Sequence, residues 1–188
     1  RWDALEATGG VTLALDQAIA RSAPSSLLVT TTANPSGSRY GRLRHSIGSA
    51  PKAVTCQLRV YLESVSGGAP TDDANAMRLV WSFAGGSRFL DIQMTPTAAQ
   101  IQERGNANDG GTRDNLSGDL AFAPSTWTKL TLTTDFKTAS LVKDDGPKVS
   151  ISLDPAAPTS LEIDVGLCLD SQPPVWKYRI DDVRCDAQ

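Results

Sequence analysis

The chain has 188 residues, of which 40% are hydrophobic and 21% are charged, so its composition is that of a folded globular protein and excludes a disordered chain. The formal net charge of −3 argues against a nucleic-acid-binding protein, because such proteins usually carry a basic face. No run of about 18 apolar residues occurs, so the sequence predicts no membrane-spanning helix.

The first half of the chain alternates apolar and polar residues with a period of two, which is typical of half-buried β-strands. The clearest strand spans residues 52–64, where the even-numbered residues from 54 to 62 are apolar while Gln57, Arg59 and Tyr61 occupy the other face. The strands predicted in this half span residues 11–16, 25–32, 41–47, 52–64, 77–84, 88–94 and 98–104.

The second half continues the same pattern after one irregular segment. Residues 105–118 are rich in Gly, Asn and Asp and predict an exposed loop, while residues 1–8 are too short for a helix and end at a Gly-Gly pair. The remaining predicted strands span residues 126–136, 139–153 with a turn at 144–146, 160–170 and 175–186. About a dozen short strands separated by turns predict a single all-β domain over residues 1–188, an antiparallel β-sandwich of the jelly-roll type.

A set of short motifs links the predicted jelly-roll fold to a known family. The segments "GGVTLALD", "RSAPSSLLV", "LVKDDG", "SLEIDVGL" and "YRIDDVRCD" follow one another along most of the chain. Their order resembles that of concanavalin A-like (laminin-G-like) jelly rolls, and in particular of exported bacterial domains of that kind. The resemblance implies a concanavalin A-like sandwich located outside the cell or on its surface.

The ending "YRIDDV" also looks like the last strand of galactose-binding-like jelly rolls. In those domains the acidic pair, here Asp181 and Asp182, often lies near a structural calcium ion, so the resemblance makes these two residues the candidate metal ligands. The concanavalin A-like family is favoured by the order of features along the chain, which is a tryptophan, a strand, an acidic turn with glycine, a further strand and then Val-Gly-Leu. No other cofactor is expected, and a single histidine, His45, makes a zinc site improbable.

The stretch "LEIDVGLC" resembles the opening of the catalytic strand of laminarinase-like glycoside hydrolases. On a strand Glu162 and Asp164 share one face, and a retaining hydrolase needs two carboxyl groups flanking the bond. The resemblance implies that the second Glu of that family would fall two or three residues after Asp164. Gly166 and Leu167 occupy those positions. We therefore expect Glu162 and Asp164 to be solvent-facing strand residues, and we expect no catalytic residue in this strand.

Sugar-binding sites combine an aromatic ring with a few planar polar groups, because sugars present both C–H faces and hydroxyls. Tyr61 lies on the polar face of the clearest strand together with Arg59 and Gln57, and Trp176 is a further candidate. These four residues are the ligand-binding residues that the sequence predicts. His45 would be the base of any Ser-His-Asp site, and we expect it to be a surface residue.

The three cysteines predict one disulfide bond. Cys56 lies on the inward face of its strand and Cys185 ends the last strand, which in a jelly roll commonly returns beside early strands, so a Cys56–Cys185 bond is predicted. Cys168 is the alternative partner. A simple hairpin turning near residues 172–174 would place Cys168 opposite residue 177 instead of Cys185, which makes Cys168 the expected free thiol.

These observations favour a non-catalytic, exported module that binds a glycan or another cell-surface ligand, with no nucleic-acid partner and no membrane span. The alternative is a polysaccharide hydrolase or lyase whose catalytic groups come from elsewhere in the fold. A purely structural surface domain is the third interpretation.

Overall fold

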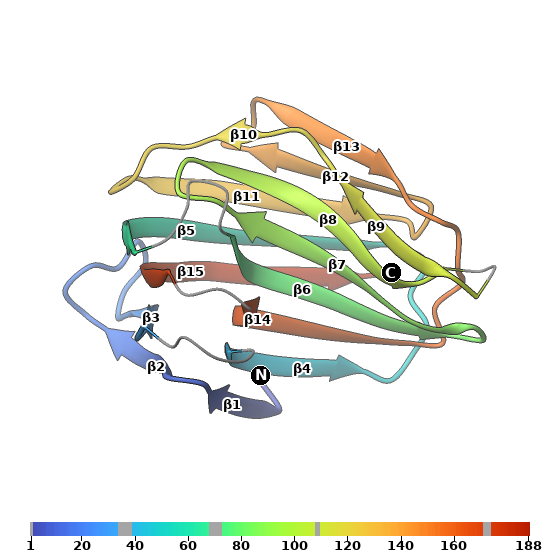
Figure 1. Ribbon diagram of the computed structural model, residues 1–188, viewed down its shortest axis with the longest axis horizontal. Coiled ribbons are helices and arrows are strands. Elements are labelled where there is room, and N and C mark those ends of the chain that lie inside the picture. Colours follow the sequence, from blue (N-terminus) through green and yellow to red (C-terminus); the bar gives the residue numbers. More distant parts are fainter. Residues whose placement is uncertain (1, 34–38, 68–72, 108–109, 171–173) are drawn as a thin grey trace.

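The computed structural model describes residues 2–33, 39–67, 73–107, 110–170 and 174–188. The described chain is all-β and forms two antiparallel sheets that pack as a sandwich (Figure 1). The predicted fold class is therefore confirmed. Among the described residues, no helix is long and apolar enough to cross a membrane.

Sheet A contains eight strands in the order β1-β4-β14-β6-β7-β8-β10, with β9 paired to β8. Their bounds are β1 (Ala4–Thr8), β4 (Arg39–Ile47), β6 (Ala74–Phe83), β7 (Gly86–Met94), β8 (Ala98–Asn106), β9 (Thr112–Leu116), β10 (Leu120–Ala121) and β14 (Ser160–Asp170). Neighbours in this order lie far apart in sequence, because β14 inserts between β4 and β6.

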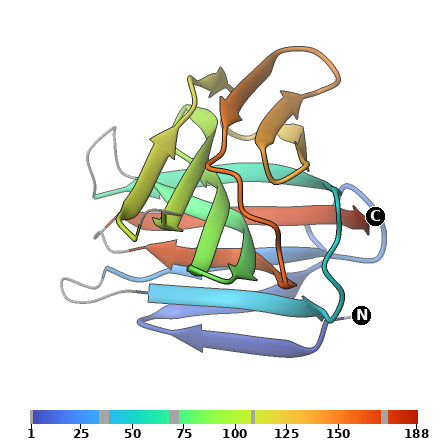
Figure 2. The same ribbon diagram turned by 90° about the vertical axis from the view of Figure 1, so that its right-hand side faces the viewer.

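Sheet B contains seven strands in the order β13-β12-β11-β5-β15-β3-β2. Their bounds are β2 (Val11–Asp16), β3 (Ser26–Thr31), β5 (Val54–Ser66), β11 (Trp127–Thr134), β12 (Thr138–Lys143), β13 (Lys148–Ser152) and β15 (Val175–Ala187). The two termini lie on the same side of the molecule in Figure 2, where the segment between β13 and β14 also runs down across the end of the sandwich.

Most strands form where the alternation predicts them, and β2 and β14 have the predicted bounds. The structure adds β1, β9 and β10. Strand β9 lies within residues 105–118, so that segment is not a loop throughout, contrary to expectation. The turn at Gly9-Gly10, where both residues have positive φ, lets β1 and β2 leave in different directions toward the two sheets. Strand β9 lies at an edge of sheet A with mostly polar residues, and therefore shows no apolar periodicity.

The core lies between the inward faces of the two sheets. Strand β14 contributes Leu161, Ile163, Val165 and Leu167, all at most 2% exposed, and β5 contributes its even-numbered residues from 54 to 62. Trp176 and Trp81 are both fully buried in this core. Each strand of the sandwich therefore buries one face of its alternating pattern and leaves the other face for polar groups.

The predicted disulfide is confirmed. Cys56 and Cys185 occupy paired positions on β5 and β15 and are joined by an S–S bond of 2.05 Å. Cys168 is a free, buried cysteine, as expected. The reason given for that expectation is wrong, since β14 and β15 form no hairpin but belong to different sheets, and part of the turn expected at residues 172–174 lies outside the described residues.

Candidate functional site

The outer face of sheet A, which we call the front face, carries a dense set of polar side chains. Alternation places on it the outward residues of five adjacent strands. The members used below are Tyr40, Arg42 and Arg44 of β4, Glu162, Asp164 and Cys168 of β14, Asn75 and Arg78 of β6, Asp91 and Gln93 of β7, and Gln102 and Arg104 of β8. This face is the candidate functional site.

One row of paired residues crosses the middle of the front face from strand to strand. In register, Arg44 lies opposite Asp164, Asp164 opposite Arg78, Arg78 opposite Asp91, and Asp91 opposite Gln102. Cations and anions therefore alternate across four of the five strands. Opposite charges on directly facing strand positions stabilise the pairing of these strands.

Asp164 is the first anionic centre of the row. Its carboxylate accepts a hydrogen bond from Arg42 Nη1 at 2.8 Å and from Arg44 Nε at 3.1 Å, and its side chain is fully buried. Both arginines also contact Glu6 of β1, at 3.0 and 3.2 Å. Glu162 and Asp164 share one face as expected, but the expectation that Asp164 faces solvent is wrong, because the two guanidinium groups enclose it.

Asp91 is the second anionic centre. Arg78 binds it with two parallel hydrogen bonds, from Nε at 2.6 Å and Nη2 at 2.8 Å, and Arg104 Nη2 adds a third at 2.8 Å. Asn75 Nδ2 donates a fourth at 3.2 Å. Paired arginines of this kind are held in one orientation, which is what recognition of a planar carboxylate requires.

These groups are buried although they point away from the hydrophobic core. Asp91 and Asp164 are fully buried and Arg78 is 5% exposed. The pKa of Arg78 is raised: burial alone would lower it, but the hydrogen bonds and charge of Asp91 outweigh burial. Charges shielded from water in this way interact with a ligand more strongly than exposed charges do.

A second group of side chains lies at the end of the front face where β4 begins. Tyr40 of β4 and Cys168 of β14 both lie between the paired positions Gly41–Leu167 and Arg39–Asp170, where the register of the two strands shifts. The Arg42 guanidinium lies 4.9 Å from the centroid of the half-buried Tyr40 ring. The ring of Tyr40 is therefore held beside a cation on the front face.

Asn75 and Gln93 belong to the same end of the front face and occupy paired positions. Asn75 is 1% exposed, and its Oδ1 has no hydrogen-bond partner among the described residues, although its Nδ2 is bonded to Asp91. A buried amide oxygen without a donor costs free energy, so this group is ready to accept a hydrogen bond from a ligand.

Two further titratable groups of the front face have shifted pKa values. The pKa of Glu162 is raised, first by burial and then by repulsion from Asp164, although Arg44 and Arg42 oppose the shift. Burial raises the pKa of the Cys168 thiol well above its usual range, so this cysteine is a neutral thiol and a poor nucleophile at neutral pH.

Three of the ligand-binding residues predicted from the sequence lie together, but on the opposite side of the molecule. Gln57, Arg59 and Tyr61 are half-buried on the outer face of sheet B. Trp176 does not join them, because it is a fully buried core residue that packs edge-on against Tyr178 at 6.4 Å. Its prediction as a ligand contact has to be corrected: on β15 its side chain points inward.

Asp181 and Asp182 serve the fold through bonds to protein groups. The Asp181 carboxylate accepts hydrogen bonds from the backbone N–H groups of Arg21, Ser22 and Asp182 at 2.7–2.9 Å and from the Ser22 hydroxyl at 2.8 Å. Asp182 is paired with Arg59 at 3.0 Å. Within the described ranges, no three His, Cys, Asp or Glu side chains gather as a group that could hold a metal ion.

His45 lies at the surface, as expected, with Nδ1 3.0 Å from Asp3. Its position on β4 belongs to the same face of the strand as Leu43 and Ile47, away from the front face. It lines a cavity of about 250 Å³ with Trp2, Ile163, Val183 and Cys185, and these described lining residues include no serine that could complete a triad.

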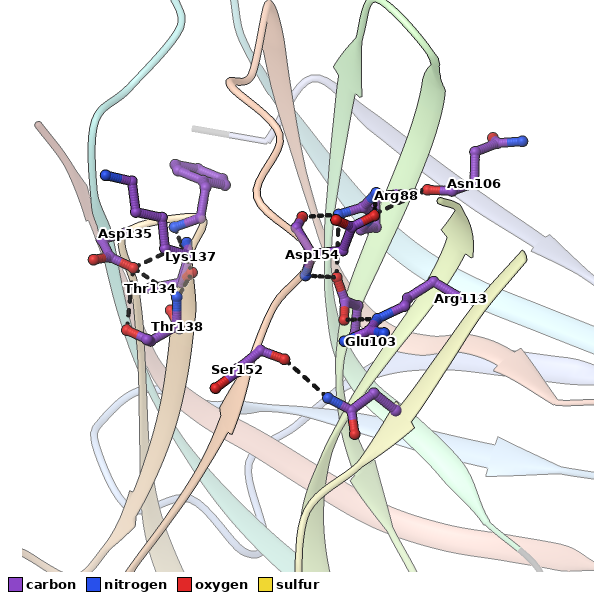
Figure 3. A network of polar contacts seen from close by, with 12 residues as sticks. Arg88, Glu103, Asn106, Arg113, Thr134, Asp135, Lys137, Thr138, Ser152 and Asp154 are labelled. Carbon is purple, nitrogen blue, oxygen red and sulfur yellow. Dashed lines mark hydrogen bonds and ion pairs between the residues drawn. The ribbon is translucent and has the colours of Figure 1, made fainter. Parts of the chain in front are cut away.

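A separate polar network is buried at one end of the sandwich (Figure 3). Arg88 of β7 is fully buried and is bonded to Glu103 at 3.3 Å, to the Asn106 carbonyl at 2.7 Å, and to the carbonyl and carboxylate of Asp154. Arg113 binds the other carboxylate oxygen of Glu103 at 2.9 Å. This network fastens the segment after β13 to sheet A and has a structural role.

The arginines and amides of the front face were not predicted from the sequence. A signal was present, since Tyr40, Arg42 and Arg44 alternate with Gly41 and Leu43 in the segment "RYGRLR". What the sequence lacked was the pairing that brings this segment beside "LEID" and "MRLVW". These separate polar segments form one surface only because of the order of their strands in sheet A.

Comparison with known proteins gives structural relatives only: no family model and no curated protein matches the sequence. An endo-β-1,4-glucuronan lyase from the fungus Trichoderma reesei superposes with a TM-score of 0.77 at 14% identity, covering 100% of this chain and 91% of that chain. A family 7 alginate lyase A1-II′, in complex with substrate, gives 0.63 at 10% identity, covering 89% and 80%. The alginate lyase from Klebsiella pneumoniae gives 0.56 at 8% identity, covering 89% and 83%.

The fold is therefore the concanavalin A-like jelly roll that the sequence motifs predicted, in the form seen in polysaccharide lyases. These neighbours contradict the expectation of a non-catalytic binding module, because these three structures, which share the fold over 89–100% of this chain, are described as polysaccharide lyases. They support the alternative, a polysaccharide-cleaving enzyme, better than the main interpretation.

Proposed function

We propose that this protein is a lyase that cleaves an acidic, uronate-containing polysaccharide by β-elimination on its front face. The observation that carries the proposal is the likeness, over the whole chain, to an enzyme described as a glucuronan lyase. Glucuronan and alginate are both polymers of uronic acids. The second support is the set of buried and half-buried arginines on the face that points away from the core.

The chemistry sets three requirements. A base removes the proton from the carbon that bears the carboxylate, the negative charge that develops on that carboxylate is stabilised, and the glycosidic oxygen on the adjacent carbon leaves with a proton. The C–H and C–O bonds break, a C=C bond forms, and no water is consumed. The product therefore carries an unsaturated uronate at its new non-reducing end.

Stabilisation of the carboxylate falls to the arginines and to the amides beside them. Arg78 uses Nε and Nη2 to bind Asp91, which leaves Nη1 outside these two bonds, and Arg104 is 32% exposed beside it. A guanidinium carries five N–H donors, so each can hold its aspartate and still donate to a ligand. Asn75 Oδ1, which has no hydrogen-bond partner among the described residues, would accept a hydrogen bond from a sugar hydroxyl.

Proton transfer is assigned to Tyr40. Its ring lies on the front face with the Arg42 guanidinium 4.9 Å from the ring centroid, and its hydroxyl can take up the proton from the carbon and return a proton to the leaving glycosidic oxygen. The retaining-hydrolase mechanism is not favoured. It needs two carboxyl groups free to react, and Asp164 is held by two arginines.

The location follows from the same proposal. The Cys56–Cys185 disulfide is typical of proteins that fold in an oxidising compartment, and a polymer of uronic acids is met outside the cell. We therefore place the protein outside the cell or at its surface.

The test is an incubation of the purified protein with polyglucuronate, polymannuronate and polyguluronate, followed by ultraviolet absorbance of the conjugated C=C bond. Absorbance should rise with at least one polymer. Tyr40→Phe keeps the ring against Arg42 and removes only the hydroxyl, so the rate should fall by about 100-fold or more. Thr12→Val, which removes an exposed hydroxyl from β2 of sheet B, should leave the rate unchanged.

Two results would oppose the proposal. New reducing ends without a rise in absorbance would indicate hydrolysis instead of elimination. Absence of any cleavage of all three polymers would remove the lyase assignment, and an unchanged rate in Tyr40→Phe would remove Tyr40 from the reaction.

A further inference from the structure

The outer face of sheet B presents a second ordered surface, on the opposite side of the sandwich from the front face. Two central strands, β5 and β11, run side by side there and pair residue by residue (Figure 1). Their outward side chains form a row that we call the back track, made of Gln57, Arg59 and Tyr61 of β5 and of their partners Thr131, Lys129 and Trp127 of β11.

One end of the back track is aromatic. Tyr61 and Trp127 are directly paired, with ring centroids 5.5 Å apart and planes inclined by 52°, and both rings are half-buried. The Arg179 guanidinium lies 5.8 Å from the Tyr61 ring and is itself fixed by Asp16 at 2.6 Å and by Glu63. The two rings are thus a preformed platform of the kind on which the C–H face of a sugar packs.

The other end of the back track is a polar hollow. A cavity of about 290 Å³ is lined there by Thr55, Gln57, Thr131, Arg184 and Asp186. Within the described part of the chain, the Gln57 amide and the hydroxyls of Thr55 and Thr131 form no hydrogen bonds, so they remain free for a ligand. Amides and hydroxyls that both donate and accept match the hydroxyl groups of a sugar.

The charges along the back track cancel in pairs. Arg59 is bound to Asp182 at 3.0 Å, Lys129 to Asp145, and Lys177 to Glu63 at 2.6 Å. In the hollow, Arg184 and Asp186 contribute one charge of each sign. A surface without net charge gives no electrostatic attraction to an acidic polymer, so its chemistry matches a neutral one.

From these observations we propose that the back track binds a neutral polysaccharide chain, with one sugar packed on Tyr61 and Trp127 and another hydrogen-bonded in the hollow beside Gln57. Gln57 and Tyr61 are four residues apart on one strand, about 13 Å, so a chain of several sugars spans both ends. This binding surface lies beyond the catalytic face and does not depend on it. It would anchor the protein to a neutral polymer while the front face acts on an acidic one.

Isothermal titration calorimetry with cellohexaose and laminarihexaose tests this proposal, with an oligoglucuronate of the same length as the acidic comparison. We expect at least one neutral hexasaccharide to bind, and the affinity to be insensitive to salt. Trp127→Ala should weaken binding roughly tenfold and Gln57→Ala roughly threefold or more. Leu15→Ala is the matched control, since Leu15 is 79% exposed on β2 of the same sheet but outside the back track.

The experiment separates this proposal from the lyase function. Tyr40→Phe should keep full affinity for the neutral sugar, and Gln57→Ala should keep full lyase activity on a short soluble substrate. Thermal unfolding of Trp127→Ala shows whether that variant is folded. If it is not folded, the affinity of Gln57→Ala for the neutral hexasaccharides tests the proposal instead. Failure of both neutral hexasaccharides to bind, binding of the acidic one alone, or unchanged affinity in Gln57→Ala would overturn the proposal.

Discussion

At the scale of single residues, buried polar groups hold chain segments together. Asp181 illustrates this, because one carboxylate binds three backbone N–H groups and one hydroxyl, and so fixes residues 21–22 against β15. Burial alone would raise the pKa of Asp181, but the hydrogen bonds from Ser22, Asp182 and Arg21 outweigh it and lower that pKa. The residue that looked like a calcium ligand is thus occupied by protein donors.

The lowered pKa of Asp181 predicts how stability depends on pH. A group whose pKa is depressed on folding stabilises the native state above its unfolded pKa, here 3.8, and this contribution is lost as the pH falls through the lower folded value. Asp181→Asn should therefore lower the free energy of unfolding by about 1–3 kcal/mol at neutral pH. Urea unfolding of both proteins between neutral and acid pH measures this, and a difference that does not shrink below about pH 4 would contradict it.

Arg88 carries the largest single-residue prediction. It is fully buried between Glu103 and Asp154 (Figure 3), and removal of one partner of a buried ion pair leaves the other charge without compensation. Arg88→Met should lower the free energy of unfolding by about 3–5 kcal/mol.

The control for Arg88 is Arg113→Met, which breaks a bond to the same Glu103 from a side chain that is 37% exposed. Its cost should be about 1 kcal/mol or less, since solvent weakens exposed ion pairs. Chemical denaturation gives both values. If both variants lost the same amount of unfolding free energy, burial of Arg88 would not be the cause of the large effect of its ion pairs.

At the scale of elements, β14 decides the geometry of the front face, because it joins β4 on one side to β6 on the other. Its close approach to β4 depends on Gly166, which pairs with Arg42 and has a φ of +133°. A Cβ atom at position 166 would clash with the carbonyl oxygen of Gly41. The two strands can pair here only because Gly166 has no side chain at this contact.

Gly166→Ala should consequently destabilise the protein by at least about 1–3 kcal/mol, the cost of holding a non-glycine residue in such a conformation, before the clash is counted. Because the variant displaces β14 from β4, lyase activity should fall as well. Gly48→Ala is the matched control: a Cβ atom added there would have no described atom within 4 Å and no positive φ is required, so its thermal unfolding should match that of the wild type. A Gly166→Ala protein with the melting temperature of the wild type would contradict this account.

The pairing of β5 with β15 is the corresponding feature of sheet B. It aligns Tyr61 with Arg179 and Cys56 with Cys185, although bulges shift the register twice along the pair. The side chains at the aromatic end of the back track, and the ion pair of Arg59 with Asp182, therefore depend on the last strand of the chain.

At the scale of the whole molecule, the disulfide links two residues that are 129 positions apart in sequence. Closing a loop of that length restricts the unfolded chain, and the entropic model gives about 5 kcal/mol for it. The double variant Cys56→Ala/Cys185→Ala should therefore lose about 2–5 kcal/mol of unfolding free energy.

Cys168 supplies the control for the disulfide. It is buried and unpaired, so the folded protein should show no thiol that reacts with an aqueous reagent, and the unfolded protein without reductant should show one. Mass spectrometry of the alkylated protein reads out both numbers. Three reactive thiols in the unfolded, unreduced protein would show that the bond is absent.

The chain by itself determined the local features. Period-two alternation placed most strands to within a few residues, because it depends on neighbours a few positions away. The Cys56–Cys185 bond was predicted from the inward position of Cys56 together with the expected return of the last strand beside early strands. Strands β1, β9 and β10 were missed, since short or polar edge strands bury too little apolar surface to show the pattern.

Only the tertiary structure decided which polar faces become one site. Arg42 and Asp164 are 122 positions apart, and each looks like an ordinary solvated strand residue in the sequence. They meet because β14 pairs with β4 while β15 joins the other sheet, and strand order of this kind is set by the packing of the complete core. Alternation determines which side of its strand a residue occupies, but it does not determine which distant strand lies beside it. The front face depends on which strands are neighbours.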